Sequence, residues 1–236
     1  MIMPQSSFDG VGEAMNRTDP AYRGQEHYTP WFLRIYDVLV LAIYGPLVWR
    51  CPTRRLVQQY TRRVGRRHLD IGPGTGYFLE HARLPPDTSV VLVDPNPNVL
   101  AYASRRLRHI KPSLVQADVC KPLPVDQRFD SIALNFVLHC LPGPMLQRAA
   151  TIRNLAALLE PAGVLFGATL LGTPELHTWL SRAALRQNNR LGFFDNLSDT
   201  EAAVRDILNQ SFESVDVELV GSVAVFGAMK PRHVRL

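Results

Sequence analysis

Lysine is nearly absent from this sequence of 236 residues, in which Lys111, Lys121 and Lys230 are the only lysines. The 26 basic residues exceed the 21 acidic ones, so almost all of the formal charge of +5 comes from arginine. An arginine excess of this kind can follow from genome composition alone. The modest net charge therefore indicates no particular partner.

Cysteine is also scarce, with three residues at Cys51, Cys120 and Cys140. Their number is odd and they form no Cys-x-x-Cys pair, which disfavours both a disulfide framework and a zinc site. Because this usage fits a reducing compartment, we expect a cytoplasmic location and no bound metal.

No hydrophobic run is long enough to cross a membrane. The longest, at residues 38–49, holds twelve uncharged residues, whereas a transmembrane helix needs about 20. We expect a buried or cleft-lining helix there that breaks near Gly45 and Pro46. The first thirty residues are polar and lack the apolar core of a secretory signal.

The composition is that of a globular protein, with 46% hydrophobic and 20% charged residues. It excludes collagen-like, disordered and disulfide-dense classes. At roughly 150 residues per domain, the length suits one or two domains. Residues 1–27 carry no periodicity and are predicted to form a mobile tail, and residues 28–64 read as helices punctuated by prolines.

From residue 65 the pattern changes to short apolar runs that alternate with helical segments. The predicted strands are residues 67–71, 90–94, 113–117, 130–135 and 163–170, and the predicted helices are residues 76–82, 97–108 and 145–159. Such alternation is typical of βαβ units with a parallel sheet. Glu160 and Pro161 are expected to end the third helix and turn the chain toward the next strand.

The C-terminal part departs from this alternation. Residues 172–197 show no clear strand, and residues 198–210 read as a helix opened by Ser198 or Asp199. Two closely spaced strands follow, at residues 214–220 and 223–229. We therefore expect an α/β fold with a doubly wound, mostly parallel sheet of seven strands that ends in an antiparallel hairpin strand.

The most informative segment, residues 68–76, reads His-Leu-Asp-Ile-Gly-Pro-Gly-Thr-Gly. A strand ends on the carboxylate of Asp70 and enters a glycine loop that opens a helix. Glycine at positions Gly72, Gly74 and Gly76 lets the backbone come close to a ligand, and the helix N-terminus offers free N–H groups.

Three details indicate which ligand suits this loop. The dinucleotide fingerprint needs its third glycine one place later, where this chain has Tyr77. Asp70 would repel a pyrophosphate but attract an ammonium group. Asp94 ends the second strand 22 residues after Gly72, where a carboxylate can accept hydrogen bonds from both ribose hydroxyls. A ligand with a ribose, a cationic end and no phosphates is S-adenosylmethionine rather than NAD.

With these motifs the chain resembles the class I S-adenosylmethionine-dependent methyltransferases, which share a Rossmann-like fold, over about residues 30–230. The resemblance implies that Asp70 anchors the methionine amine, directly or through water, and that Asp94 holds the ribose diol. Asp118 would accept from the adenine amino group, although it suits a turn equally well, and Asn135 would lie beside the sulfonium. The other residues placed at the cofactor are Gly72, Pro73, Gly74, Gly76, Pro95, Val119 and Tyr36.

Two residues are candidates for catalysis. His139 follows the fourth strand where many family members have histidine, and Tyr28 lies in N-terminal helices that in this family often form a lid. The alternatives are a structural histidine that caps the next helix and an ordinary core aromatic. On the lid interpretation, residues 28–64 bind substrate and residues 65–236 form the cofactor-binding core, within a single domain.

Seven arginines lie between residues 50 and 67, namely Arg50, Arg54, Arg55, Arg62, Arg63, Arg66 and Arg67. Their helical spacing favours a solvated helix face. The alternative is a nucleic-acid or membrane-surface binding protein rather than an enzyme. We expect no nucleic-acid partner.

The residues after Asn135 bear on the methyl acceptor. Family members that methylate adenine N6 or glutamine carry two prolines there, whereas this chain continues with Phe136, Val137 and Leu138. The pocket is left to the N-terminal helices and residues 172–197, both rich in aromatic residues and leucine. We expect O-, N- or C-methylation of a small, fairly apolar acceptor in secondary metabolism. The alternative within the fold is a cyclase or pericyclase that uses the cofactor without methyl transfer.

Overall fold

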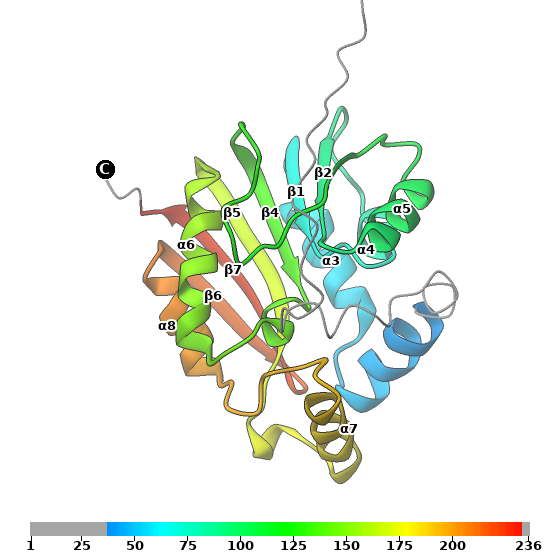
Figure 1. Cartoon of the computed structure of the whole chain (residues 1–236), viewed down its shortest axis with the longest axis vertical. Helices are drawn as coiled ribbons and strands as arrows, with labels where there is room; N and C mark the ends of the chain where they lie inside the picture. Colours follow the sequence, from blue (N-terminus) through cyan, green and yellow to red (C-terminus); the bar gives the residue numbers. More distant parts are fainter. Residues whose placement is uncertain (1–36, 233–236) are drawn as a thin grey trace, which may run out of the picture.

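The computed structural model of the chain describes residues 37–232, which form a seven-stranded sheet covered by helices on both faces (Figure 1). The strands are β1 (Arg67–Ile71), β2 (Ser89–Val93), β3 (Ser113–Val115), β4 (Phe129–Asn135), β5 (Leu159–Leu170), β6 (Phe212–Val220) and β7 (Val223–Pro231). Their order is β3-β2-β1-β4-β5-β7-β6. The first five strands run parallel, and β7 is antiparallel to both β5 and β6. This confirms the predicted fold.

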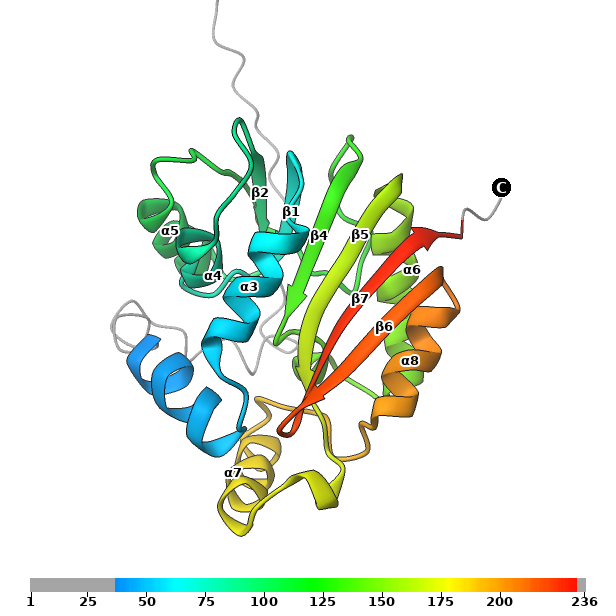
Figure 2. The same ribbon diagram turned by 180° about the vertical axis from the view of Figure 1, so that it is seen from behind.

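The helices are η1 (Asp37–Val48), α3 (Thr53–Arg63), α4 (Tyr77–His81), α5 (Pro97–Arg106), α6 (Ala149–Ala157), α7 (Trp179–Arg190) and α8 (Glu201–Asn209), with short 3₁₀ turns η2 (Leu138–Cys140), η3 (Met145–Arg148) and η4 (Pro174–Leu176). Helices α6 and α8 cover one face of the sheet, whereas α3, α4 and α5 cover the other (Figures 1 and 2). Helix α7 and η1 lie beyond the carboxyl ends of the parallel strands (Figure 2).

The core follows from the pleat of the strands. In β2, Val91 and Val93 pack in the cluster that includes α6 and α8, while Val90 and Leu92 pack in the cluster that includes α3, α4 and α5. Because both faces are covered, β2 is apolar at every position from Val90 to Val93. This explains why a short uninterrupted apolar run predicted this strand correctly.

Two helices at the start of the described chain differ from expectation. The break expected near Pro46 is wrong, because η1 continues to Val48 as a wide π-type helix, which relieves the clash of the proline ring with the preceding turn. In α3, Leu56 and Tyr60 are buried, and the Gln59 side chain donates to backbone carbonyls of β5 and β7. Because α3 is a core helix, the lid interpretation is restricted to residues before it.

Residues 145–159 are not one continuous helix. Helix α6 ends at Ala157 and β5 already begins at Leu159, so Glu160 and Pro161 lie in a strand instead of a turn. The strand starts early because Leu159 pairs with Phe129 before a bulge shifts the register. The N-cap of α8 is Thr200, not Ser198 or Asp199, and α7 occupies part of a segment for which no helix was predicted.

No helix within residues 37–232 is long and apolar enough to span a bilayer. The predicted tail at residues 1–27 and the start of the predicted lid, residues 28–36, lie outside the described residues.

Candidate functional site

A cavity lies at the carboxyl ends of β1, β2 and β4, where the strand order reverses on the two sides of β1. In open parallel sheets this switch point is the usual place for a ligand. The cavity brings together eight of the residues singled out from the sequence: Gly72, Pro73, Gly74, Asp94, Pro95, Asp118, Val119 and Asn135. Asp70, Gly76 and His139 are not among its lining residues, and Tyr28 and Tyr36 lie outside the described residues.

The three loop glycines have left-handed backbones but different surroundings. At Gly74, φ is +56° and an added Cβ would meet nothing within 4 Å. At Gly76 a Cβ would contact Leu107 at 3.1 Å, so this glycine lets α4 pack closely on α5. At Gly72 it would collide with Val137 at 2.6 Å. Of the three loop glycines, only Gly74 therefore faces open space at the position of a Cβ atom.

Asp94 lies at the end of β2 on the cavity wall. Its Oδ1 accepts a hydrogen bond of 2.7 Å from the Asn96 backbone N–H. Burial raises the pKa of Asp94 to about 7, and the bond from Asn96 offsets only part of that rise. The Asp94 carboxylate therefore accepts too few hydrogen bonds to offset its burial, and it can accept further hydrogen bonds from a ligand.

Asp118 also lines the cavity, after the short strand β3. Its Oδ1 accepts a hydrogen bond of 2.9 Å from the backbone N–H of Cys120, and its carbonyl accepts one of 3.0 Å from Lys121. The structure therefore shows the turn-forming role that the sequence left open, at a position that also faces the cavity.

Asp70 is buried next to the cavity rather than in its wall. The Tyr60 hydroxyl lies 3.1 Å from each of its carboxylate oxygens. Burial raises the pKa of Asp70 to about 8, and the hydrogen bond from Tyr60 acts in the opposite direction. Burial and the charge of Asp70 raise the pKa of Tyr60 well above its usual range, so the phenol is the donor.

Asn135 ends β4 with its side chain in the cavity wall, buried yet without a hydrogen-bond partner for Oδ1 or Nδ2 among the described residues. It is close enough to Tyr60 to lower the pKa of that phenol slightly against the larger effect of burial. A buried amide with four free hydrogen-bonding positions is costly unless a ligand or water satisfies it.

His139 lies behind the cavity on η2. Its Nδ1 accepts from the backbone N–H of Leu170 at 3.3 Å, and its ring packs edge-on against Phe194 with centroids 4.6 Å apart. Burial lowers the pKa of His139 to about 3. A histidine with this pKa is a weak base, and this one supports the ring of Phe194 instead of facing the cavity.

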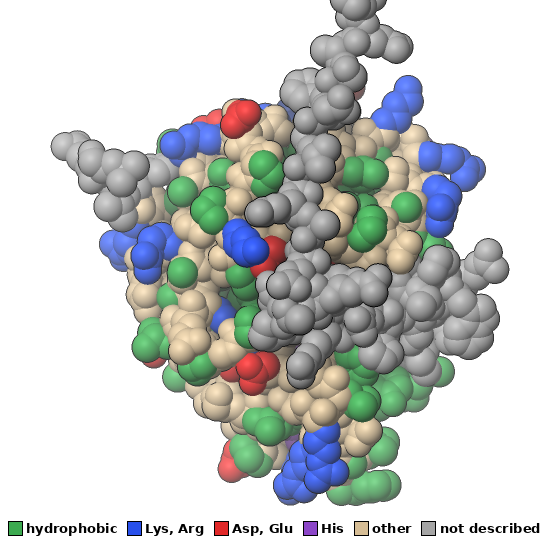
Figure 3. Space-filling view, viewed as in Figure 1, with side chains coloured by type: hydrophobic (Ala, Val, Ile, Leu, Met, Phe, Trp, Pro, Cys, Tyr) green, Lys and Arg blue, Asp and Glu red, His purple; other side chains and the backbone are tan. Residues whose placement is uncertain are grey.

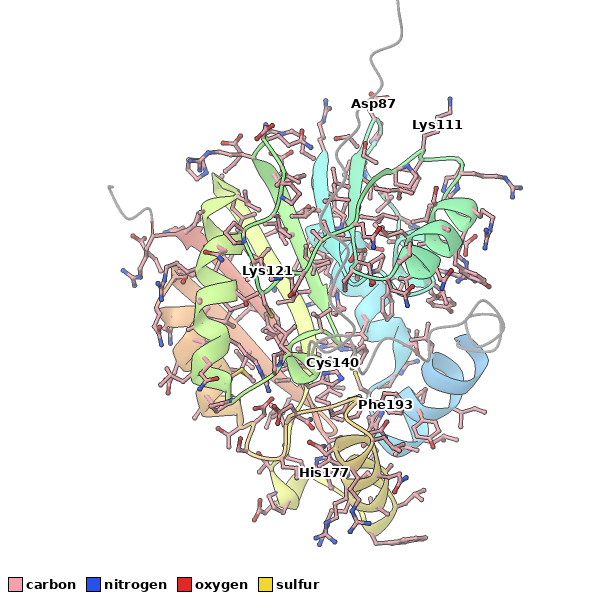
Figure 4. All side chains as sticks on the ribbon, viewed as in Figure 1. Asp87, Lys111, Lys121, Cys140, His177 and Phe193 are labelled. Atoms are coloured by element: carbon pink, nitrogen blue, oxygen red, sulfur yellow. The ribbon has the colours of Figure 1, made fainter. Side chains whose placement is uncertain are left out.

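The open end of the cavity has an apolar wall. The sequence assigns the acceptor pocket to the N-terminal helices and residues 172–197 without identifying the wall residues. The wall consists of Leu41, Phe136, Cys140, Leu141, Phe193 and Phe194. Cys140 and Phe193 approach the same space from η2 and from the loop after α7 (Figure 4). Phe136 has φ of +56°, an uncommon backbone for a bulky residue, which turns its ring toward this wall.

The loop that carries Phe193 and Phe194 is tied down by a buried ion pair. Arg148 Nη1 lies 2.5 Å from Asp199 Oδ2, and both side chains are almost fully buried. Arg148 also donates to the backbone carbonyls of Gly143 and Asp195. Removing one partner of such a pair strongly destabilises the folded protein, because the other charge is left buried and unpaired. The ion pair fixes the segment after α7 against the turn that follows η2.

Three of the seven arginines from residue 50 to 67 form ion pairs within the protein, whereas Arg54, Arg62 and Arg66 are exposed and form none among the described residues. Arg55 pairs with Glu218 at 2.5 Å and Arg63 with Asp216 at 2.8 Å, which joins α3 to strand β6. Arg67 pairs with both Asp130 and Glu160. These pairs favour a structural role for the cluster over a nucleic-acid surface. Within residues 37–232, no group of three or more His, Cys, Asp or Glu is arranged to hold a metal.

A family model described as a methyltransferase domain matches residues 48–207. The physcion biosynthesis cluster O-methyltransferase of Aspergillus chevalieri is 37% identical over 221 residues, which are 92% of this chain and 100% of that protein. The demethylluteothin O-methyltransferase of Streptomyces thioluteus is 37% identical over 207 residues, 87% of this chain and 90% of the relative.

Solved structures share the fold. The N-methyltransferase NodS of Bradyrhizobium japonicum, in complex with S-adenosyl-L-homocysteine, has a TM-score of 0.54 at 19% identity and covers 75% of this chain and 87% of NodS. Human N-acetylserotonin methyltransferase, in complex with S-adenosylmethionine, has a TM-score of 0.60 at 19% identity over 91% of this chain and 57% of that protein.

Proposed function

Because this chain belongs to the class I S-adenosylmethionine-dependent methyltransferases and transfers the methyl group of that cofactor, we propose that its acceptor is a small, largely apolar molecule of secondary metabolism. The observation that carries the proposal is the apolar wall of Leu41, Phe136, Phe193 and Phe194 at the open end of the cavity. Two relatives at 37% identity are named as O-methyltransferases, which supports a hydroxyl group as the acceptor.

The residues of the cavity fit the cofactor. S-Adenosylmethionine has a cationic amino acid end, a ribose diol and an adenine, and it carries no phosphate. Three features of the cavity suit such a molecule. They are the unpartnered amide of Asn135, the carboxylate of Asp94, which accepts few hydrogen bonds, and the open space above Gly74. The two buried polar groups are costly without a ligand and are satisfied by one, and the space above Gly74 leaves room for it.

We assign the binding roles accordingly. Asp94 accepts from the ribose hydroxyls, Asp118 accepts from the adenine amino group, and Asn135 contacts the methionine portion. Asp70 attracts the amine from behind the wall, directly or through one water. The remaining contacts come from the backbone of Gly72, Pro73, Gly74 and Pro95 and from the side chain of Val119.

When bound, the cofactor would supply an electrophilic methyl group on its sulfonium, which passes to the acceptor by in-line attack on the methyl carbon while the thioether of S-adenosyl-L-homocysteine leaves. The chain contributes mainly position and the exclusion of water. Phe193 and Phe194 would hold a planar acceptor, and the Arg148–Asp199 pair fixes the loop that carries them. Because burial lowers the pKa of His139, we do not assign it as the base. A phenolic or enolic hydroxyl that ionises readily would need none.

Helix η1 contributes Leu41 to the same wall. We propose that η1 forms part of the lid over the acceptor, and that the lid extends to the residues before η1, which include the candidate residues Tyr28 and Tyr36. We also propose a cytoplasmic enzyme without a nucleic-acid partner, which the three free cysteines and the ion-paired arginines of α3 support.

Methyl transfer can be tested with S-adenosylmethionine labelled at the methyl group and a panel of phenols, enols and aromatic amines. The proposal expects labelled product, identified by mass, with phenols or enols and little with amines. Tight cofactor binding without label in any acceptor would contradict it and favour an enzyme that uses the cofactor without transfer. Label in amines only would retain the methyltransferase and overturn the choice of oxygen.

A further inference from the structure

One exposed surface of the protein combines unpaired arginines with large apolar side chains. On α7, Arg182, Arg186 and Arg190 recur at intervals of four residues and are all exposed, so they form one stripe along the helix. Trp179, at the start of the same helix, is 80% exposed. Ser181 and Leu185 point inward and pack the helix on the protein.

These arginines differ from Arg55 and Arg63 of α3, which form ion pairs. Arg182 donates to the backbone carbonyl of His177, and Arg186 and Arg190 form no ion pair with any residue in the described part of the chain. Glu175 and Asp195 are the exposed acids on the adjoining turns. Neither forms an ion pair with the stripe in the described part of the chain, and the Asp195 carboxylate accepts from the Gly143 backbone N–H. The stripe therefore offers charge to an outside partner, which the ion-paired Arg55, Arg63 and Arg67 do not.

The apolar part of the surface comes from two elements. Leu180 of α7 and Leu191 just after it are exposed, and so are Ile43 and Leu47 of η1, the latter to 71%. The two helices meet through a shared cluster of buried side chains that includes Val48 and Leu185. Figure 3 shows hydrophobic and basic side chains side by side at the lower end of the molecule, where Figure 1 places α7.

We propose that this surface, which we call the α7 face and which consists of Ile43, Leu47, Trp179, Leu180, Arg182, Arg186, Arg190 and Leu191, docks on an anionic lipid bilayer. Arginine can reach lipid phosphates while tryptophan and leucine enter the boundary between headgroups and acyl chains. A nucleic acid would use the arginines but would leave five large apolar side chains in water. The combination of both kinds of side chain therefore favours the bilayer.

The α7 face adjoins the open end of the cavity. Leu41 of η1 and the segment from Gly192 to Phe194 line that end, and both continue directly into the α7 face. Docking would turn the cavity entrance toward the membrane surface, where an apolar acceptor partitions. The docking inference itself rests on the surface alone and does not depend on the identity of the acceptor.

Co-sedimentation of the full chain with phosphatidylcholine vesicles, with and without phosphatidylglycerol, tests this inference. Binding is expected only with the anionic lipid and should weaken with added salt. Replacing Arg182, Arg186 and Arg190 together by Gln should lower the partition coefficient by on the order of 100-fold, from about five-fold per arginine. Trp179→Ala should lower it several-fold, and should remove the shift in tryptophan emission on binding.

A matched control removes the same charge elsewhere. Arg62 in the last turn of α3, Arg66 just before β1 and Arg108 just after α5 are exposed, and their joint replacement by Gln should leave vesicle binding close to that of the unmodified chain. An equal loss of vesicle binding in both triple variants would mean that binding depends only on the net charge of the protein, and it would overturn the proposal. So would no binding of the unmodified chain to anionic vesicles, or binding to duplex DNA through the α7 arginines in place of vesicles. Unchanged cofactor affinity in the α7 variants would show that a loss of docking is not a loss of fold.

Discussion

The Tyr60 hydroxyl lies 3.1 Å from each oxygen of the Asp70 carboxylate, so a single phenol on α3 holds both atoms. Tyr60 itself is fixed by stacking on Phe78, with ring centroids 5.4 Å apart, and by an edge contact with Phe166. The aspartate that precedes the glycine loop is therefore set by a helix from outside the βαβ core. Under the role proposed above for Asp70, Tyr60 is a positioning residue for cofactor binding.

Tyr60→Phe removes the donor while keeping the packed ring. Because the hydrogen bond from Tyr60 lowers the pKa of Asp70 against the larger effect of burial, the variant should ionise Asp70 less readily. Isothermal titration at neutral pH should then show S-adenosylmethionine binding weakened by about ten-fold, with recovery at higher pH. Tyr102→Phe on α5 is the control and should bind normally. Equal affinities for all three proteins across the pH range would exclude the positioning role.

Asp70→Asn should make the protein without cofactor more stable. Burial raises the pKa of Asp70 from 3.8 to about 8, so the folded state holds a proton that the unfolded state has lost. Its contribution to stability is present at low pH and is lost as pH rises from about 4 to 8. Thermal unfolding should show a higher Tm for the variant at pH 8 and a gap that closes toward pH 4, together with loss of cofactor binding. A gap that is independent of pH would contradict this account.

Gly74→Ala and Gly192→Ala form a matched pair. Both glycines have positive φ, and an added Cβ meets nothing within 4 Å at either, so both substitutions should cost about 1–2 kcal/mol of stability through the left-handed backbone. Both glycines line the cavity, but Gly74 does so beside the cofactor residues and Gly192 beside Phe193. We expect Gly74→Ala to raise the dissociation constant of S-adenosylmethionine, and Gly192→Ala to raise only the KM of the acceptor. Identical cofactor affinities would mean that the loop does not cradle the cofactor.

His139→Asn tests whether the histidine is a base or a support. The amide can still accept from the Leu170 N–H, but it cannot support Phe194 as the imidazole ring does. We expect a raised KM for the acceptor and a kcat within about ten-fold of the original, with the pH profile unchanged, since removal of a general base would cost about 10²–10⁴-fold. A kcat loss of that size, or the disappearance of a titrating limb, would assign His139 to catalysis.

Local patterns predicted most of the sheet. Strands β1 and β2 and the closely spaced pair β6 and β7 were found within a few residues. The run at β2 is apolar because both faces of the sheet are covered, and a short link favours a hairpin. The glycine loop and Asp94 were also found from spacing alone, and the structure brings them to one cavity.

What escaped prediction depends on contacts between distant segments. Helix α7 was missed because only its inward residues, such as Leu185, are apolar and its outer face mixes Trp179 with arginines. The early start of β5 depends on pairing with Phe129, and the buried pairing of Arg148 with Asp199 joins residues 51 positions apart. Nor could the sequence show that Asp70 lies behind the cavity wall, since that depends on Tyr60 from another helix.

The central claim is that one cavity holds the cofactor between Asp94 and the apolar wall that includes Phe193. The most direct measurement is a crystal structure of the complex with S-adenosyl-L-homocysteine. The account predicts both ribose hydroxyls within about 2.6–3.2 Å of the Asp94 carboxylate, the Asn135 amide hydrogen-bonded to the methionine portion, and the sulfur facing Phe136 and Phe193. A ribose bound away from Asp94, or a sulfur directed away from that wall, would contradict it.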